Sequence, residues 1–187
     1  PVTGEGVVGR NFAYQNMTTI KAFFDKDVFT NPFIGAGGNG VGVDDFNADN
    51  FDHAKEGFVG GSPFWVNQAG TKPISGLPTP PGTPAWGSKW KAAVADAYTH
   101  HVSMDAHGAH QSYRNNYLDL DPNYKNVFGQ PLLRMTFDWQ ENDIKMAQFM
   151  YDKMAPIAKA MNPKLIAGSP KNANSHFDTT SYQTTHM

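Results

Sequence analysis

The sequence contains no cysteine, no long apolar run and no marked excess of either charge. Without cysteine, the chain cannot form disulfide bonds or hold a metal through thiolates. Its 15 basic and 17 acidic residues give a formal net charge of −2 and form no long run of one sign. A groove for nucleic acid or a surface for anionic membranes is therefore not indicated. No apolar stretch approaches the length of a membrane span, and no signal-peptide pattern is visible at the start.

The composition nevertheless indicates a folded chain. Its 187 residues are enough for one domain with a hydrophobic core. Hydrophobic residues make up 40% and aromatic residues 13% of the chain, which argues against disorder. The 18 glycines and 13 prolines predict that much of the chain is loop.

The most regular stretch lies between Tyr117 and Met161. Within it, residues 131–139 alternate apolar and polar side chains, which is the period of a half-buried strand. The polar side is formed by Arg134 and its alternate neighbours. The apolar side consists of Leu133, Met135, Phe137 and Trp139.

An amphipathic helix is predicted to follow this strand. Asp138 stands three residues before Glu141, a helix-start pattern, and Asn162-Pro163 is a stop signal. Pro156 is expected to kink the last turns or to begin a second short helix. The apolar stripe at helical spacing consists of Ile144, Ala147, Met150, Tyr151, Met154, Ile157, Ala158 and Met161. A strand that leads into such a helix predicts an α+β fold, in which helices pack on a mixed or antiparallel sheet.

The region before this stretch contains a proline-rich segment and a second predicted helix. Residues 68–84 are too rich in proline and glycine for a helix or a sheet interior, so they are predicted to form a surface loop or a lid. Thr83-Pro84 then matches a helix N-cap and first turn. Trp86 and Trp90 follow at helical spacing with Ala97, which predicts that both tryptophans face the core.

Three patterns suggest ligand sites but are interpreted more simply. Residues 35–40 satisfy G-x-G-x-x-G by letter, yet no helical stripe follows, so a flexible loop is preferred to a phosphate site. The oxygen-bearing residues of Asp45–Glu56 resemble a calcium loop, but Asn50 stands where glycine is required, which favours a solvated acidic turn. Four histidines, at positions 100, 101, 107 and 110, lack the helical context of a metal site and are interpreted as surface or core-edge residues.

Three motifs resemble the glucose–methanol–choline (GMC) family of flavin oxidoreductases. They are Tyr-Leu-Asp-Leu-Asp-Pro-Asn-Tyr-Lys at 117–125, Gly-Gln-Pro-Leu-Leu-Arg-Met-Thr-Phe-Asp at 129–138, and Glu141-Asn142-Asp143. Within that family the chain is most similar to the branch of bacterial sugar and sugar-acid dehydrogenases, the gluconate 2-dehydrogenase branch. Enzymes of this family are considerably longer, so the resemblance implies that the chain is a fragment, in agreement with a start at Pro1.

The resemblance implies roles for three residues. Gly9 and Asn11 match a Val-Gly-x-Asn-apolar segment that lies close to the flavin in the family. Many members continue with Asp-His, whereas this chain has Tyr14-Gln15, as in the sugar-acid branch. His186, in Thr-Thr-His, matches the catalytic base, which accepts the hydroxyl proton of a sugar or sugar acid while hydride passes to FAD.

The family also implies a domain division, partners and a location. Residues 1–30 would face the flavin, 31–170 would form the substrate-binding domain, and 171–187 would begin the return to the flavin domain. The FAD phosphate-binding loop would lie outside this chain, so the chain alone is expected to be inactive. The implied partners are a cytochrome c subunit and a small accessory subunit, at the periplasmic side of a bacterial inner membrane. An alternative is a stand-alone extracellular module that binds calcium or glycans through Asp45–Glu56, without catalytic activity.

Overall fold

The computed structural model describes residues 6–30, 40–67 and 79–176 of the 187-residue chain. The G-x-G segment at 35–39, the segment at 68–78 and His186 lie outside these residues. The elements in chain order are β1 (Asn16–Phe23), β2 (Gly40–Val43), the 3-10 helix η1 (Ala48–Asn50), α1 (His53–Glu56), β3 (Phe64–Asn67), α2 (Ser88–Ala97), β4 (His101–Gly108), β5 (Tyr117–Lys125), β6 (Pro131–Thr136), α3 (Glu141–Ala160) and β7 (Leu165–Ala167).

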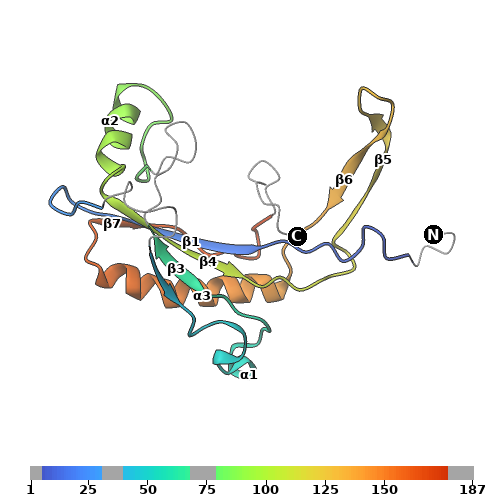
Figure 1. The fold of residues 1–187 in the computed structure, drawn as a ribbon, viewed down its shortest axis with the longest axis horizontal. Coiled ribbons are helices and arrows are strands. Elements are labelled where there is room, and N and C mark those ends of the chain that lie inside the picture. Colours follow the sequence, from blue (N-terminus) through green and yellow to red (C-terminus); the bar gives the residue numbers. More distant parts are fainter. Residues whose placement is uncertain (1–5, 31–39, 68–78, 177–187) are drawn as a thin grey trace.

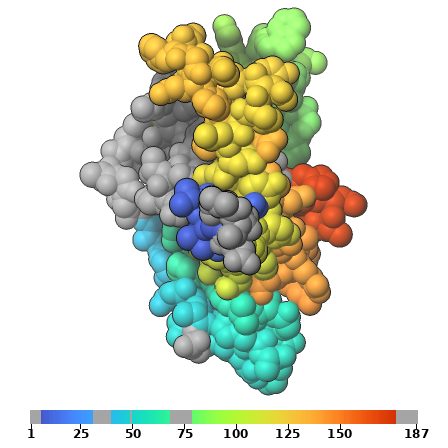
Figure 2. All heavy atoms as spheres, turned by 90° about the vertical axis from the view of Figure 1, so that its right-hand side faces the viewer, coloured from blue at the N-terminus to red at the C-terminus, as the bar shows by residue number. Residues whose placement is uncertain are grey.

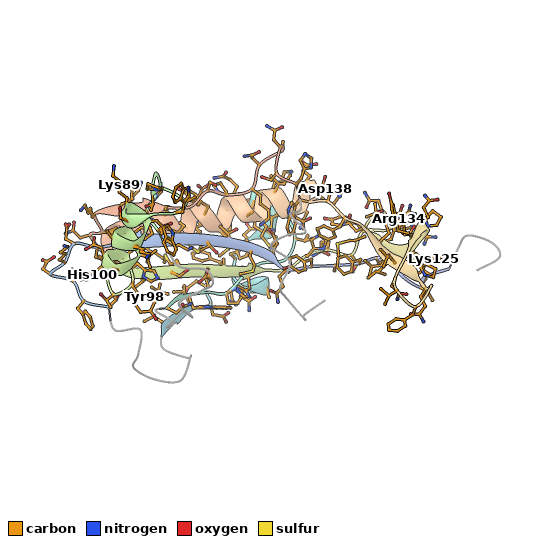
Figure 3. The ribbon with its side chains drawn as sticks, turned by 90° about the horizontal axis from the view of Figure 1, so that it is seen from above. Lys89, Tyr98, His100, Lys125, Arg134 and Asp138 are labelled. Atoms are coloured by element: carbon orange, nitrogen blue, oxygen red, sulfur yellow. The ribbon has the colours of Figure 1, made fainter. Side chains whose placement is uncertain are left out.

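The body of the molecule is a five-stranded antiparallel sheet with strand order β2-β3-β4-β1-β7. Strands β1 and β4 pair over eight residues, from Asn16 opposite Gly108 to Phe23 opposite His101. Helix α3 packs against these two strands and covers one face of the sheet (Figure 1). Helix α2 stands at one end of the long axis, and the hairpin of β5 and β6 projects at the other end (Figures 1 and 3).

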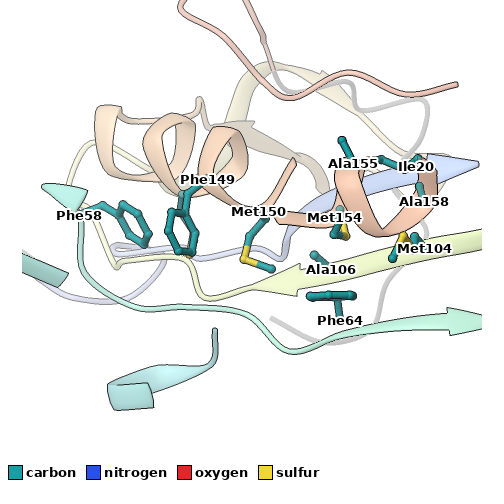
Figure 4. Packing of buried hydrophobic residues seen from close by; sticks show 11 residues of the cluster. Ile20, Phe58, Phe64, Met104, Ala106, Phe149, Met150, Met154, Ala155 and Ala158 are labelled. Carbon is teal, nitrogen blue, oxygen red and sulfur yellow. The ribbon is translucent and has the colours of Figure 1, made fainter. Parts of the chain in front are cut away.

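The core lies between α3 and the covered face of the sheet (Figure 4). Side chains at alternate strand positions point to the same face, so one set from each strand meets the apolar stripe of α3. Phe64 is completely buried, and its ring stacks on that of Phe46 with the centroids 6.2 Å apart. The buried cluster consists of Ile20, Phe58, Phe64, Met104, Ala106, Met146, Phe149, Met150, Met154, Ala155 and Ala158.

Helix α3 confirms the predicted amphipathic helix but begins differently. Its capping box joins Gln140 and Asp143 rather than Asp138 and Glu141, because the Asp143 side chain accepts from the Gln140 backbone N–H at 2.9 Å. Pro156 lies inside the helix on an exposed position, and the helix continues to Ala160, so of the two outcomes predicted for this proline, the start of a second helix is wrong. Among the described residues, no helix combines the length and apolarity needed to cross a bilayer.

The strand predicted at 131–139 is shorter in the structure, where β6 covers 131–136. Its apolar side is not buried as predicted. Among the described residues, strand β6 pairs only with β5 in a separate two-stranded sheet, and Leu133 is 67% exposed. Periodicity identifies which side of a strand is apolar, but not whether another element covers that side. Only Phe137 and Trp139, which follow the strand, pack into a cluster of aromatic rings at the base of the hairpin.

Helix α2 starts at Ser88, four residues later than predicted. The Thr83 hydroxyl donates to the carbonyl oxygen of Pro80 in a turn, so it does not cap a helix. Gly87 has φ +91°, a conformation that interrupts a helix. Trp86 therefore lies before the helix and is 83% exposed, and the prediction that it faces the core is wrong.

Candidate functional site

The face of the main sheet opposite α3 carries a row of polar and aromatic side chains. Because Ile20, Met104 and Phe64 point toward α3, their neighbours in each strand point to the other face. We call this the open sheet face. Its members on the three central strands are Met17, Thr19, Lys21, Trp65, Asn67, Ser103, Asp105 and His107.

Hydrogen bonds fix a carboxyl group in the middle of the open sheet face. The Thr19 hydroxyl donates to Oδ1 of Asp105 at 2.8 Å, and Nδ2 of Asn67 donates to Oδ2 at 3.5 Å. The Trp65 ring lies directly across the strand pair from Asp105 and contacts the His107 ring, with centroids 4.5 Å apart. A fixed carboxyl group beside an indole ring can accept hydrogen bonds from hydroxyl groups and offer an apolar surface to C–H groups.

Lys21 lies on the same face, two residues along β1 from Thr19. Its side chain is half-buried, and no acidic partner within 4.0 Å is present among the residues that the structure describes. The open sheet face therefore combines an acceptor for hydroxyl groups with a cation that can bind a carboxylate.

Gly9 and Asn11 lie at the base of the hairpin. Both adopt a left-handed conformation, with φ +77° and +58°. The Leu118 N–H donates to the Gly9 carbonyl oxygen at 2.7 Å, and a Cβ atom at Gly9 would collide with the Leu118 carbonyl oxygen. Residues 8 and 9 form a turn before the bridge residue Arg10, and Val8 is 92% exposed. The requirement for glycine at position 9 thus comes from contact with the hairpin.

The four central histidines do not converge. The ring of His101 is buried against Phe23, and this burial lowers its pKa. His100 contacts the Asp96 carbonyl oxygen through Nδ1, His107 contacts Trp65, and His110 is buried beyond the end of β4. Within the described part of the chain, no group of three or more histidine, aspartate and glutamate side chains is arranged to hold a metal.

The segment that resembles a calcium loop is closed by its own hydrogen bonds. The Asn50 side chain donates to the Asp44 carbonyl oxygen at 2.6 Å, and Asp52 accepts from the Ala54 N–H to cap α1. Glu56 ends that single-turn helix. The described part of this segment forms the acidic turn that the sequence favoured, and nothing in it favours the alternative of a calcium-binding module.

A buried His110–Asp143 pair was not identified from the sequence. Nε2 of His110 lies 3.1 Å from Oδ2 of Asp143, and the two side chains are 1% and 0% exposed. Asn16 holds the same turn of α3 through a 2.7 Å bond from Nδ2 to the Asp143 carbonyl oxygen. Gln140 and Asp143 do not match the Ser/Thr-x-x-Glu/Gln pattern of a capping box, so no local sequence signal marked this pair. The pair lies where the start of α3 meets the ends of β1 and β4, and because it is sealed from solvent it is not open to a substrate.

Lys171, which follows β7, also contacts the region at the start of α3. Its Nζ donates to the Met17 carbonyl oxygen at 2.5 Å and lies 4.4 Å from the centroid of the Trp139 ring. Burial lowers its pKa to about 8, while the nearby Asp143 carboxyl group acts in the opposite direction. An open groove of about 470 Å³ begins here and follows α3, lined by charged side chains of both signs together with Phe58, Ile144 and Phe149.

Comparison with known proteins gives one informative relative. No family model matches the chain. Over all 187 residues, the chain is 79% identical to a curated protein of Pantoea cypripedii named gluconate 2-dehydrogenase flavoprotein. The match covers 100% of this chain and 30% of that relative, so the chain spans less than a third of the relative's length.

Proposed function

We propose that this chain is part of a flavin-dependent dehydrogenase that oxidises a CH–OH group of a sugar or sugar acid, with gluconate as the leading substrate. The observation that carries the proposal is the 79% identity over the entire chain to a protein named as a gluconate 2-dehydrogenase flavoprotein. The three motifs that resemble the GMC family support FAD as the cofactor. The same resemblance supports the assignment of the sheet and α3 to the substrate-side domain of such an enzyme.

The open sheet face is the part of the domain that we assign to the substrate. A sugar acid has several hydroxyl groups and one carboxylate. Asp105, held by Thr19 and Asn67, would accept hydrogen bonds from the hydroxyl groups. Lys21 would bind the carboxylate, and the Trp65 ring would pack against the carbon chain.

Lys21→Met tests this assignment by separating acidic from neutral substrates. We expect the KM for gluconate to rise about tenfold, because a charge-assisted hydrogen bond contributes about 1.5 kcal/mol. The KM for glucose should change less than twofold, since glucose has no carboxylate. Steady-state kinetics of the full-length protein provide the measurement, with Lys26→Met as the control because Lys26 pairs with Asp96 on the surface. An equal change for both substrates would remove Lys21 from the substrate site.

Of the two residues assigned to the cofactor, Asn11 can contact the flavin through its side chain and Gly9 only through its backbone. Asn11 is exposed, and within the described residues its side-chain amide has no hydrogen-bonding partner, so it fits a contact with the flavin. Gly9 would contribute through its backbone only, since its missing side chain is explained by Leu118. The phosphate-binding loop expected for FAD would come from a part of the protein outside this chain.

His186 is the proposed catalytic base, by resemblance to the family. An alcohol carbon releases hydride readily only when its hydroxyl proton leaves at the same time or earlier. A neutral imidazole within hydrogen-bonding distance of that hydroxyl is suited to accept the proton near neutral pH. The flavin, when bound, supplies the hydride acceptor.

The remaining features of the family are proposed for the complete protein. Within residues 1–30, the segment with Gly9 and Asn11 would face the flavin, while β1 would join residues 31–170 in the substrate-binding domain because it pairs with β4 and β7. Residues 171–187 would lead back toward the flavin domain. Electrons would leave through a cytochrome c subunit, with a small accessory subunit. This assembly would lie at the periplasmic side of a bacterial inner membrane.

The proposal is tested by anaerobic mixing of the full-length protein with gluconate, 2-ketogluconate, glucose, sorbitol or fructose. We expect gluconate to bleach the flavin absorbance near 450 nm. His186→Asn should slow this reduction by about 10²- to 10⁴-fold, the usual contribution of a general base. His176→Asn is the control, because His176 lies ten residues earlier and pairs with Asp138 on the surface. A protein without bound flavin would refute the proposed activity, and an unaffected His186→Asn would refute the role of this histidine.

A further inference from the structure

The hairpin of β5 and β6 has one apolar side and one charged side. In its register, Leu118 lies opposite Met135 and Leu120 lies opposite Leu133, so these four side chains share one side, which we call the apolar hairpin face. On the other side, Arg134 donates two hydrogen bonds to Asp119, at 2.7 and 2.5 Å. Such a division between the two sides is typical of a sheet that packs against a second layer.

Among the described residues, no second layer covers the outer half of the apolar hairpin face, whereas Leu118 and Met135 nearer its base are partly buried. Leu120 is 62% exposed and Leu133 is 67% exposed. The tip adds Tyr124, Val127 and Phe128, which are 69%, 94% and 84% exposed. An isolated two-stranded hairpin is only marginally stable in water, and a contiguous exposed apolar surface usually marks an interaction site.

Both ends of the described chain leave the body at the base of this hairpin. At the N-terminal side, Arg10 forms a bridge to Tyr117, and this segment lies against β5 (Figure 2). At the C-terminal side, Nδ1 of His176 lies 2.9 Å from Oδ2 of Asp138, which follows β6. Any polypeptide that continues from either end therefore starts beside the hairpin.

We infer that the apolar hairpin face packs against another domain of the same polypeptide, namely the flavin-binding part that lies outside this chain. This inference rests on the proposed function. The relative extends well beyond the match, since 70% of its length has no counterpart here. A domain attached at the hairpin base has a high effective concentration at that face, which a free partner lacks. A face of large aliphatic side chains without charge suits an interface that stays buried permanently.

A photo-crosslinking experiment identifies what covers the face. The full-length protein is produced with p-benzoylphenylalanine in place of Leu133, irradiated, and digested for mass spectrometry. We expect a crosslink from the hairpin to a peptide of the same molecule outside these 187 residues. A crosslink between two copies, a crosslink to another subunit, or no crosslink overturns the inference. The same probe in place of Val41, which is also 67% exposed in a strand, is the matched control and should not label that peptide.

A charge placed on the face gives a second, independent readout. Leu133→Asp should lower the apparent unfolding temperature of the full-length protein by about 5 °C or more, since it buries an unpaired carboxylate. Val41→Asp should change it by less than about 2 °C. An unchanged unfolding temperature for Leu133→Asp overturns the inference. Neither experiment measures enzymatic turnover. Packing of the hairpin on another domain can therefore be detected even if the protein does not oxidise gluconate, so the two proposals can fail separately.

Discussion

The sheet covered by α3 and the hairpin of β5 and β6 are built from the same kind of sequence but reach different states. Both alternate apolar and polar residues, and both present one apolar side. In the sheet, that side meets α3, and Phe64 and Met104 are 0% and 1% exposed. In the hairpin, the equivalent side carries Leu120 and Leu133 at 62% and 67% exposure.

The difference shows that alternation alone does not build a core. Hydrophobic stabilisation scales with apolar area removed from water, so the strands of the sheet are stabilised by the helix that covers them. The hairpin has its ladder of backbone hydrogen bonds and one surface ion pair, which contribute little by comparison. Its stability must come from whatever packs on it.

The largest expected effect is the loss of stability when a core side chain of the sheet is truncated, compared with the same change in the hairpin. Phe64→Ala is expected to lower the free energy of unfolding by about 4 kcal/mol, because it leaves a cavity in a sealed core. Leu133→Ala should change it by no more than about 0.5 kcal/mol in the 187-residue chain, because this side chain is already in water. Urea unfolding followed by tryptophan fluorescence gives both values. Similar losses for the two substitutions would contradict the contrast between core and hairpin.

The buried His110–Asp143 pair of the body should contribute more to stability than the exposed Arg134–Asp119 pair of the hairpin. Asp143→Ala is expected to cost about 3 kcal/mol, because it removes the capping box of α3 and leaves His110 buried without its partner. Asp143→Asn should cost less, since its amide oxygen can still accept from the Gln140 N–H. Arg134→Ala, in the exposed pair with Asp119, should give no measurable change. The comparison fails if Arg134→Ala destabilises as much as Asp143→Ala.

An effect confined to alkaline pH is a pH dependence of stability that belongs to the body. The folded chain holds the pKa of Lys171 at about 8, below its ordinary value of 10.5. Between these values the unfolded chain binds more protons, so the contribution of this group to stability rises as pH rises from about 8 to 10.5. Reductive ¹³C-methylation should reveal one lysine resonance that titrates near pH 8 and is absent in Lys171→Met. Titration of that resonance near 10.5 would contradict the burial of this amine.

The sequence predicted the periodic elements well and the contacts between elements poorly. Helix α3 was predicted from its stripe, and its end at Ala160 lies within two residues of the Asn162-Pro163 stop signal. A strand was predicted over 131–139 and β6 forms over 131–136, yet its exposure was not predicted, because exposure depends on a covering layer that one strand cannot specify. Strand β4 was missed, since its histidines, serine and aspartate show no clear apolar alternation before their neighbours are known.

The open sheet face was not predicted as a site from the sequence. The positions of Gly9 and Asn11 as flavin contacts, and of His186 as the base, come from the family resemblance and stay predictions. The polar row around Asp105 was not found, because Thr19, Asn67 and Asp105 are distant in sequence and meet only through strand pairing. The acidic turn at 45–56 was predicted correctly, since its hydrogen bonds are local.

The contacts at the start of α3 also set when the chain can complete its fold. Asn16 bonds to a residue 127 positions later, and Lys171 reaches back 154 positions to Met17. Contacts of such high sequence separation form late and slow the search for the native topology. During synthesis on the ribosome, β1 must therefore wait for α3 and Lys171 to emerge, and this interval is when chaperones would be needed most.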